Sequence, residues 1–362
     1  MSSLIVEICK VEDIIKHPNA DRLSIVRVKL WNCIVGLDQY KIGDLVVFIP
    51  PDCIIPQNLI EEHKLEYLKH DGRTRTVKLR GAISQGLILD LPEGKKWKEG
   101  EDASEFLNIK KWEPPEPKFY VQTKKTSKKK INPFFDKYTD IENVKNYPDV
   151  FTEDDTVVIT EKIHGCNARY ANLEISISGN QPILDKVALW VKKYILKKTH
   201  EFVYGSHNVQ ITFHSNRNSF YGEDVWGEIA KRYDFANKIP EGYIVYGEIY
   251  GEGIQDLTYG MKGTDIVIFD VKKDGEYLSW NDVVFFCGKR GWRTVPELYI
   301  GKYSADTLKR CTVGKSILCP TQIREGCVVK TWPEENDISI GRKILKSVSE
   351  EYYLRKDGTE YK

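Results

Sequence analysis

The sequence of 362 residues lacks any apolar run that approaches the ~20 residues needed to span a bilayer. Its N-terminus, MSSLIVEICKVED, has no basic segment followed by a long apolar stretch, so we expect no secretory signal. None of the eight cysteines forms a C-x-x-C pair, which argues against a zinc knuckle or zinc finger. We therefore expect an intracellular protein, cytoplasmic or nuclear and not secreted, with reduced thiols. Nothing in the sequence indicates a membrane or an obligate protein partner.

Net charge is nearly absent as well. The 54 basic residues are balanced by 53 acidic residues, which argues against a mode of nucleic-acid binding that coats the polymer. A local basic groove remains compatible with this balance, because attraction to phosphate depends on where Lys and Arg lie. The length fits two domains better than one.

The first 115 residues contain the short β-rich runs LSIVRVKLW, LVVFIP and GLILDLP, separated by turn-forming segments such as HPNAD and KIGD. Several short strands within about a hundred residues indicate a small closed barrel. The segment KHPNADRLSIVRV resembles the opening of the tRNA-binding barrels of the OB type, and this resemblance implies a fold only. Residues 1–115 are therefore predicted to form an OB-like barrel domain.

Residues 116–136 are predicted to form a basic linker, because they combine Pro, Ser, Thr and Lys without periodicity. A cluster of cations within this segment has three interpretations: a solvated linker, a contact with RNA phosphates, or a nuclear-import signal. The cluster consists of Lys124, Lys125, Lys128, Lys129 and Lys130.

Residues 137–362 are predicted to form a second domain, in which strands and helices alternate. The runs TVVITEKI, IVYGEIYG, DIVIFDV and GCVVKTW are typical of buried strands. Apolar residues at helical spacing predict helices over ILDKVALWVKKYILKKTHEF and EDVWGEIAKRYDFANKI. Because regular βαβ spacing is missing, we expect an α+β domain.

Lys162 ends a strand run within TEKIHGCNARY, and Gly165 follows it three residues later. A lysine at the end of a buried strand is partly desolvated, which lowers the pKa of the amine and frees a nucleophilic lone pair. A single K-x-x-G is common by chance, and most lysines are merely solvated. The meaning of Lys162 therefore depends on the segments that follow it.

Further segments follow in a fixed order. They are FHSNRNSF with Arg217, IVYGEIYG with Glu248, IVIFDV with Phe269 and Asp270, REGCVVK with Glu325 and Lys330, and GRKILKSVS with Lys346. Together with TEKIHGCN they resemble motifs I, Ia, III, IIIa, IV and V of the covalent nucleotidyltransferases, the superfamily of DNA ligases, RNA ligases and capping enzymes. The resemblance covers about residues 155–350 and implies an antiparallel-sheet nucleotidyltransferase domain.

This resemblance implies that ATP and Mg²⁺ or Mn²⁺ are the cofactors and that Lys162 attacks the α-phosphate. Fixed cations at Lys330 and Lys346 would offset the phosphate charge. Asp270 and Glu325 would hold a divalent ion, which also favours the neutral amine.

The remaining motif residues are expected to bind the nucleotide. Phe269 would stack on adenine, while Glu248 and Arg217 would hold the ribose and later the phosphate, with Glu248 also a metal ligand. Glu161, His164 and Asn167 complete the predicted ATP site, with Asn167 as a metal or phosphate contact.

Several features favour an RNA ligase within this superfamily. DNA ligases usually place Asp where this chain has His164, and E-K-I-H-G-x-N is similar to motif I of the nick-sealing RNA ligases. The spacing from Glu325 to Lys330 matches that group, and VKLRGAISQGLIL looks like its N-terminal domain. Only 16 residues follow Lys346, which leaves no room for the C-terminal OB domain of DNA ligases and capping enzymes. The second lysine of motif V is missing, and Lys343 is its possible substitute.

The resemblance thus implies an ATP-dependent RNA ligase that passes AMP from Lys162 to a 5′-phosphate end, which a 3′-hydroxyl then attacks. The expected partners are RNA ends in nicked duplex RNA or an RNA/DNA hybrid. Two alternatives remain: a GTP-dependent capping-type guanylyltransferase, and a non-catalytic RNA-binding protein with an OB barrel.

Overall fold

The chain separates into two compact units. The computed structural model describes residues 5–112, 132–176, 187, 190–195, 197, 199–211 and 224–355. The first unit comprises residues 1–115, 140–151 and 350–356, and the second comprises residues 116–139, 152–349 and 357–362. Within the part of the chain described, no helix is long and apolar enough to cross a bilayer.

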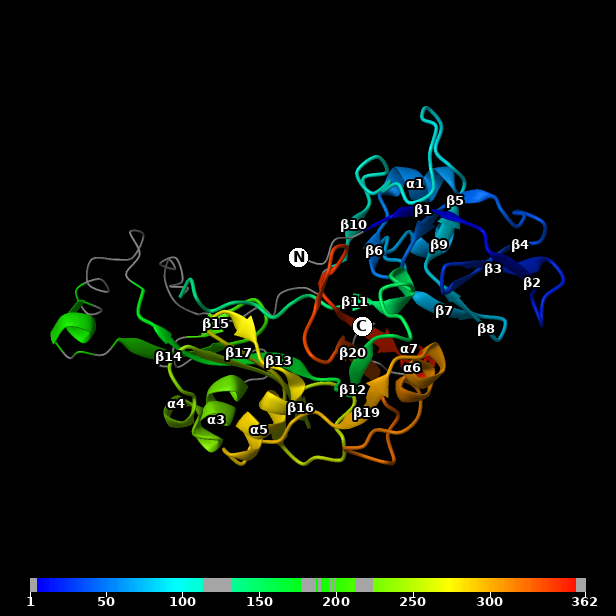
Figure 1. Cartoon of the computed structure of the whole chain (residues 1–362). Helices are drawn as coiled ribbons and strands as arrows, with labels where there is room; N and C mark the ends of the chain where they lie inside the picture. Colours follow the sequence, from blue (N-terminus) through cyan, green and yellow to red (C-terminus); the bar gives the residue numbers. More distant parts are fainter. Residues whose placement is uncertain are drawn as a thin grey trace. The chain divides into compact units, whose positions relative to one another are not determined.

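The first unit consists mainly of short antiparallel strands (Figure 1). They are β1 (Glu7–Lys10), β2 (Asp13–Lys16), β3 (Leu23–Val28), β4 (Trp31–Gly36), β5 (Leu45–Ile49), β6 (Cys53–Ile54), β7 (Thr76–Leu79), β8 (Ala82–Gln85), β9 (Leu87–Leu89) and β10 (Lys110–Lys111). The strands pair in the orders β1-β5-β9, β2-β3-β4, β7-β8 and β10-β6. The helix α1 (Gln57–Glu62) and the turn η1 (Glu66–Leu68) lie between β6 and β7.

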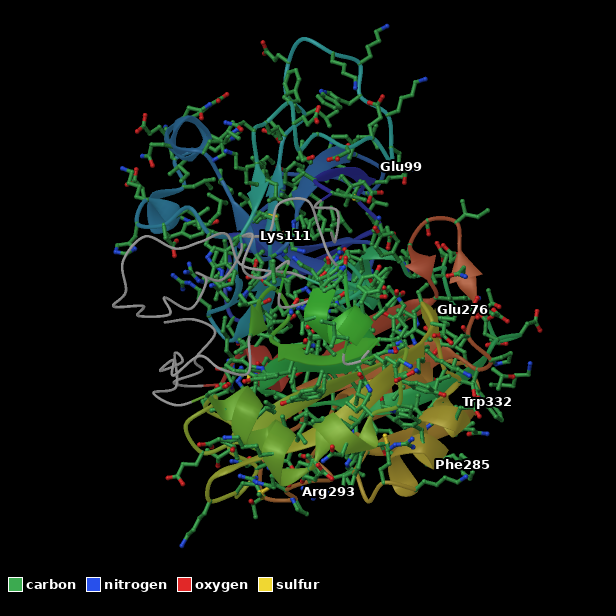
Figure 2. All side chains as sticks on the ribbon, turned by 90° about the vertical axis from the view of Figure 1, so that its left-hand side faces the viewer. Glu99, Lys111, Glu276, Phe285, Arg293 and Trp332 are labelled. Atoms are coloured by element: carbon green, nitrogen blue, oxygen red, sulfur yellow. The ribbon has the colours of Figure 1, made fainter. Side chains whose placement is uncertain are left out.

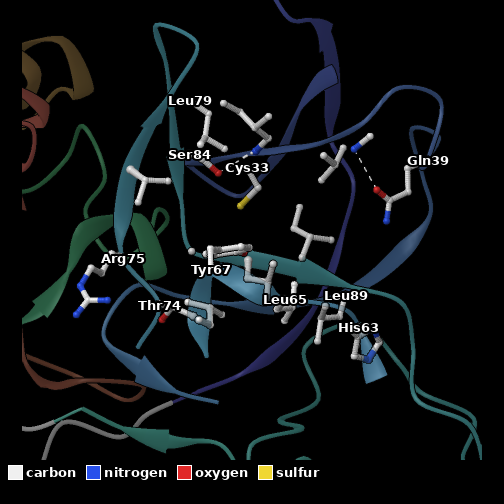
Figure 3. Close-up of a pocket in the computed structure, with 18 of the residues that line it drawn as sticks. Cys33, Gln39, His63, Leu65, Tyr67, Thr74, Arg75, Leu79, Ser84 and Leu89 are labelled. Carbon is white, nitrogen blue, oxygen red and sulfur yellow. Dashed lines mark hydrogen bonds between the residues drawn. The ribbon is translucent and has the colours of Figure 1, made fainter. Parts of the chain in front are cut away.

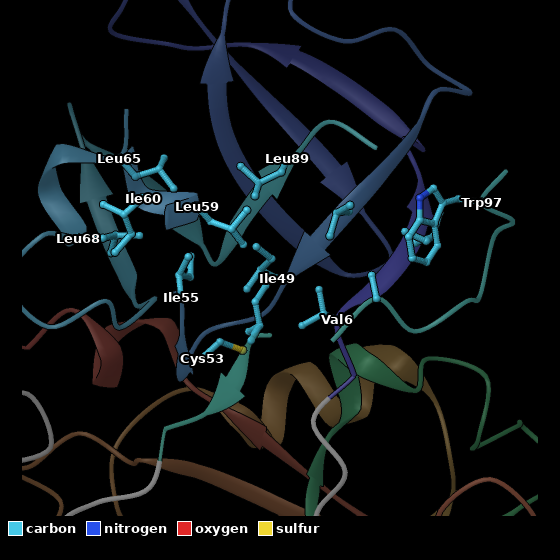
Figure 4. Close-up of a cluster of buried hydrophobic side chains, with 14 residues drawn as sticks. Val6, Ile49, Cys53, Ile55, Leu59, Ile60, Leu65, Leu68, Leu89 and Trp97 are labelled. Carbon is cyan, nitrogen blue, oxygen red and sulfur yellow. The ribbon is translucent and has the colours of Figure 1, made fainter. Parts of the chain in front are cut away.

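Strand β5 is buried on both faces, which explains why LVVFIP is continuously apolar rather than alternating. Val47 and Ile49 pack into one cluster with Leu59 of α1, and Figure 4 shows Ile49 and Leu59 within this cluster. The alternate residues Val46 and Phe48 pack into a second cluster. The two clusters form because successive side chains of a strand point to opposite faces.

Two segments distant in sequence complete the first unit. Trp31 Nε1 donates to Asn146 Oδ1 at 3.0 Å, and Lys145 Nζ lies 3.5 Å from Glu350 Oε1. The segments 140–151 and 350–356 therefore group with the barrel, whereas the sequence prediction had assigned them to the second domain. These contacts join residues that are more than 100 positions apart, and such contacts produce no periodic pattern in the sequence.

The second unit contains two larger antiparallel sheets and the two-stranded pair of β21 (Asn336–Asp337) and β22 (Gly341–Arg342). Of the larger sheets, one includes the order β23-β20-β12-β19, and the other has the order β15-β14-β13-β16-β17-β18. The strands of the first are β12 (Thr156–Lys162), β19 (Glu297–Lys302), β20 (Gly326–Thr331) and β23 (Ile344–Val348). Those of the second are β13 (Cys166–Glu174), β14 (His200–Gly205), β15 (Gln210–Ile211), β16 (Tyr243–Gly251), β17 (Thr264–Lys273) and β18 (Glu276–Tyr277).

Four helices accompany these sheets in the described part of the second unit: α3 (Val225–Arg232), α4 (Phe235–Lys238), α5 (Trp280–Gly288) and α6 (Ala305–Thr312). Asp224 caps α3, because its Oδ1 accepts from Gly227 N at 3.0 Å. Helix α5 buries Trp280 and Phe286 but leaves Phe285 62% exposed, and Figure 2 shows Phe285 pointing outward.

The predicted buried strands of the second domain are confirmed as β12, β16, β17 and β20. The predicted helix over residues 223–239 is present as α3 and α4, interrupted where Asp234 adopts a φ of 54°. The helix predicted over residues 183–202 ends too late, because β14 already begins at His200. Its described part includes a helical turn at Val191–Ile195. The lysine cluster at residues 124–130 lies outside the described residues.

Candidate active site

Lys162 lies where the two sheets of the second unit are joined. Strand β12 ends at Lys162 and β13 begins at Cys166, so residues 163–165 lead from one sheet into the other. Across the sheet, Lys162 is paired in register with Gly326 at the start of β20. Glu325 immediately precedes that strand, and its Oε1 lies 2.7 Å from Lys162 Nζ. The carboxylate side chain is only 4% exposed, so the nucleophile candidate sits against a buried anion.

Gly165 is required by close packing in the turn after Lys162. A Cβ at this position would lie 2.1 Å from the carbonyl oxygen of Ile249 and 3.1 Å from Glu248 Cγ. No side chain fits such a distance to backbone, so only glycine allows this approach. Glu248 therefore lies against the turn, and it is paired in register with Asn167. The structure thus brings Lys162, Glu248, Asn167 and Glu325 into one region.

His164 is buried beside the same carboxylate. Its Nε2 lies 2.8 Å from Asp256 Oδ1, its Nδ1 lies 3.8 Å from Glu325 Oε2, and its side chain is 3% exposed. Its backbone N–H donates to the hydroxyl of Tyr259 at 2.7 Å. Asp256 and Tyr259 were missed by the sequence reasoning. They belong to the loop between β16 and β17, where single residues without a motif carry no signal.

Two buried acceptors lie on or next to these elements. Asn167 Oδ1 and Glu161 Oε1 have no hydrogen-bond partner within the described structure. Glu161 points to the opposite face of β12 from Lys162, and its Oε2 accepts from Ile317 N at 2.8 Å. Burial raises the pKa of Glu161. Because an unsatisfied buried acceptor is costly, each of these oxygens would gain from a donor on a bound ligand.

Asp270 occupies a different environment from the one expected of a metal ligand. Its side chain is fully buried, and its Oδ2 lies 2.7 Å from Arg342 Nη2. The same oxygen accepts from the hydroxyl of Tyr138 at 2.8 Å, while Lys330 Nζ lies 3.4 Å from the carboxylate. A metal would have to displace these cations. The surroundings therefore give no support to the predicted metal-binding role of Asp270, and we interpret it as the centre of a buried ion cluster.

Phe269 remains partly exposed beside this cluster. Its ring meets Tyr138 edge to face, with ring centroids 4.7 Å apart. Edge-to-face contact leaves the face of one ring open, so the geometry is compatible with stacking of an adenine on Phe269. Tyr138, which the sequence reasoning did not single out, fixes this ring from the side.

Lys346, Lys330 and Lys343, the three lysines predicted to contact phosphate, lie in different surroundings. Lys346 on β23 is paired with Val328, which is paired with Thr160, so by register its side chain leaves the sheet on the face of Lys162. Lys330 is withdrawn into the Asp270 cluster and also lies 3.0 Å from Glu334. Its predicted contact with phosphate therefore has no support in this geometry.

Lys343 lies at the other end of β12 from Lys162. Its Nζ lies 2.7 Å from Asp155 Oδ1, and Asp155 precedes Lys162 by seven positions. An extended chain covers roughly 23 Å over that separation at ~3.3 Å per residue. The structure therefore argues against Lys343 as the substitute for the missing motif V lysine. Arg217 lies outside the described residues.

A large pocket is present in the first unit, and none of the described residues of the candidate active site lines it. It has a volume of about 690 Å³ and is bordered by β4, β9, the β7–β8 hairpin and η1. Its lining is largely apolar, with Cys33, Tyr67 and Arg75 among the lining residues that Figure 3 labels. Tyr67 is 68% exposed, so an aromatic ring is presented to solvent at this pocket.

Comparison with known proteins agrees with both units. The sequence profile of the RNA ligase family matches residues 155–348, and a profile of an OB-fold domain matches residues 5–91. A comparison with curated protein sequences found no match.

Solved structures of an RNA ligase from Naegleria gruberi are similar over almost the whole chain. A lysine-to-alanine variant with ATP and Mn has a TM-score of 0.72 and 22% identity, over 97% of this chain and 98% of that one. A variant without ligand has a TM-score of 0.73 and 22% identity, over 97% of both chains. A lysine-to-methionine variant with AMP and Mn has a TM-score of 0.73, also at 22% identity, over 97% and 98% of the two chains.

These matches establish a ligase fold preceded by an OB-fold domain, as the sequence predicted. The profile match covers more than half of the 362 residues, and the chain belongs to the RNA ligase family. It is an enzyme of the ligase class that acts on RNA ends.

Proposed function

We propose that the enzyme is an ATP-dependent RNA ligase that charges Lys162 with AMP and seals nicks in a duplex. The observation that carries this proposal is the position of Lys162 Nζ, 2.7 Å from the buried Glu325 at the junction of the two sheets. The structures of the Naegleria ligase with ATP or AMP and Mn support the choice of nucleotide.

In the first step the Nζ lone pair of Lys162 attacks the α-phosphorus of ATP. A P–N bond forms, the bond from this phosphorus to the bridging oxygen of pyrophosphate breaks, and the amine gives up a proton. Charge that develops on the phosphates must be offset by fixed cations. Lys346 is the candidate for this role, since it shares a sheet face with Lys162. Phe269 would hold the adenine by stacking.

The residues present fit a divalent metal, because Mg²⁺ binds through one or two carboxylates and otherwise keeps water and phosphate ligands. Glu325 and Glu248 would hold it, with the buried Oδ1 of Asn167 as a further oxygen donor. The metal would neutralise phosphate charge and relieve the attraction between Glu325 and the charged form of Lys162.

The second and third steps join the RNA ends. The 5′-phosphate of one end attacks the phosphorus of lysyl-AMP, which breaks the P–N bond and gives an A(5′)pp(5′) end. The 3′-hydroxyl of the other end then attacks the 5′-phosphate and expels AMP. We assign the holding of the nicked duplex to the OB-fold domain, because such barrels combine a backbone-tracking surface with aromatic stacking platforms.

Labelling with ATP tests the chemistry. The full chain is incubated with a divalent metal and α-labelled ATP or GTP, and the products are separated by denaturing electrophoresis. We expect covalent label from ATP alone, and none on the Lys162→Ala variant, since it lacks the attacking amine. Undiminished labelling of that variant would remove Lys162 from its role. Labelling by GTP would favour a capping-type guanylyltransferase instead.

Sealing assays test the substrate. Nicked duplexes that differ only in the sugar at the 3′-hydroxyl end are compared, because the 2′-hydroxyl is the local group that distinguishes RNA from DNA. We expect the RNA end to be sealed faster. Equal rates would contradict a preference for RNA at the 3′ side of the nick while leaving the lysine chemistry intact.

A further inference from the structure

We propose that Asp256 is a positioning residue for lysine adenylylation, acting through His164 and Glu325 on the orientation of Lys162. The inference rests on the proposed function of Lys162. It concerns a residue in the loop between β16 and β17, outside the segments that resemble the nucleotidyltransferase motifs.

Two close contacts and one longer one lead from Asp256 to the nucleophile. Asp256 Oδ1 lies 2.8 Å from His164 Nε2, and the other ring nitrogen lies 3.8 Å from Glu325 Oε2. Glu325 Oε1 in turn lies 2.7 Å from Lys162 Nζ. The His164 and Glu325 side chains are 3% and 4% exposed, so little water competes for these contacts.

The contact with Asp256 determines which edge of the imidazole faces Glu325. The χ2 torsion of histidine has broad wells, so burial alone does not fix the ring. A hydrogen bond from Nε2 to a carboxylate fixes the orientation of the ring. Because the ring is flat, holding one edge also determines the direction of the opposite edge. Nδ1 then faces Glu325 Oε2 at 3.8 Å, too far for a hydrogen bond, so the imidazole acts on this carboxylate by packing and charge. The other oxygen of Glu325 lies 2.7 Å from Lys162 Nζ.

The same loop also fixes the backbone of His164. Tyr259 accepts a hydrogen bond from His164 N at 2.7 Å, and its own backbone N–H donates to Gln322 Oε1 at 2.6 Å. Tyr259 is buried and adopts a φ of 54°, a conformation that costs energy for a bulky residue and persists where its surroundings hold it. The loop after β16 therefore holds His164 at two points.

A positioning role differs from a structural role in its kinetic signature. Asp256 contacts His164 and acts at the amine rather than on bound ATP, so its loss should lower the maximal rate of adenylylation without changing the KM for ATP. If Asp256 acts only through His164, removing both side chains should slow the reaction no more than removing His164 alone.

The test measures single-turnover formation of the lysyl-AMP adduct by the full chain over a range of ATP concentrations. We expect Asp256→Ala to lower the maximal rate by ~10–100-fold, the scale of loss found when the carboxylate partner of a metal-ligating histidine is removed. Asp256→Asn should recover most of the rate, because its amide oxygen still accepts from Nε2. Glu252→Gln is the matched control, since Glu252 is exposed in the same loop, and it should behave as wild type.

The outcomes separate this inference from the proposed function. An unchanged KM, recovery by Asp256→Asn and a double variant equal to His164→Ala would support it. A wild-type rate in Asp256→Ala, or losses that multiply in the double variant, would overturn it while wild-type labelling persists. Absence of label on the wild-type chain would overturn the proposed function and this inference with it.

Discussion

Arg342 and Asp270 form an ion pair in the interior of the second unit, with 2.7 Å between Arg342 Nη2 and Asp270 Oδ2. Their side chains are 7% and 0% exposed. Lys330 of β20 adds a second cation to Asp270 of β17, so the cluster joins one sheet to the other. Removing one member of a buried pair leaves a charge without compensation, which is more costly than never having buried the pair.

Asp270→Asn should therefore destabilise the fold. We expect the free energy of unfolding in urea at pH 7 to fall by about 3–5 kcal/mol. Asp149→Asn, at an exposed position, is the control and should change stability little. If Asp270→Asn unfolded at the wild-type urea concentration yet failed to form lysyl-AMP, the metal-binding role that we set aside would regain support.

The same cluster predicts a loss of stability in acid. Burial alone would raise the pKa of Asp270, but Arg342 and Lys330 hold it below its usual value. The unfolded chain, with an Asp pKa of about 3.9, then binds the proton first as the pH falls. The contribution of Asp270 is thus complete above about pH 5 and is lost as the pH falls below about 4. The stability difference between wild type and Asp270→Asn should shrink over this interval, and a constant difference down to pH 3 would contradict the assignment.

Lys346 and Lys343 should differ sharply in their effects on catalysis. Lys346→Ala should slow formation of lysyl-AMP by ~10²-fold or more, the usual scale for losing one charge stabiliser in a preorganised site. Lys343→Ala should leave the rate close to wild type, because its ammonium group pairs with Asp155 at the far end of β12. Single-turnover labelling of the two variants makes the comparison. A large loss in Lys343→Ala would restore it as the second motif V lysine.

The sequence predicted the strands that carry the chemistry because their signals are local. A β-rich run ending in Lys162 and a glycine three residues later are both readable in the sequence, whereas the close approach of the Ile249 backbone that requires this glycine is seen only in the structure. The sequence could not show that the charges of Asp270 and Lys330 compensate one another, because this ion pair forms between strands of different sheets. Asp256 was missed for a similar reason. Its proposed role depends on its contact with the buried ring of His164, which is 92 positions away.

The contacts of residues 132–138 predict where the second unit can be cut. Arg169 Nη1 donates to the carbonyl oxygen of Phe135 at 2.8 Å, and Asn132 N donates to Gln210 Oε1 at 2.7 Å. Lys272 Nζ lies 2.7 Å from Asp136 Oδ2. Residues 132–138 are therefore bound by hydrogen bonds and an ion pair to the sheet that carries Glu248 and Phe269. The sequence predicts a domain boundary near Lys137, within this segment.

A fragment of residues 132–362 should form lysyl-AMP, whereas a fragment of residues 138–362 should be impaired. The shorter fragment lacks the partners of Arg169 and Lys272, and its loss should appear both in labelling and in a lower melting temperature. Equal labelling of the two fragments would show that residues 132–137 do not contribute to the site.

The exposed ring of Tyr67 tests the contribution of the OB-fold domain to the sealing of RNA ends. Tyr67 borders the 690 Å³ pocket and is 68% exposed, which suits it to stack on an unpaired base. One stacked base is worth about 1–3 kcal/mol by alanine substitution, so Tyr67→Ala should weaken binding of a nicked duplex by ~5–150-fold. Lysyl-AMP formation should be unchanged, because every group proposed for that step belongs to the second unit.

Two variants serve as controls for Tyr67→Ala. Tyr67→Phe keeps the ring and should seal like wild type. Ile42→Ala controls for the loss of an apolar side chain from the surface of the same unit, since Ile42 is 66% exposed. Sealing by Tyr67→Ala at the wild-type rate under subsaturating RNA would exclude this ring from the RNA-binding surface. An equal loss in labelling would instead point to an effect of the barrel on the catalytic unit.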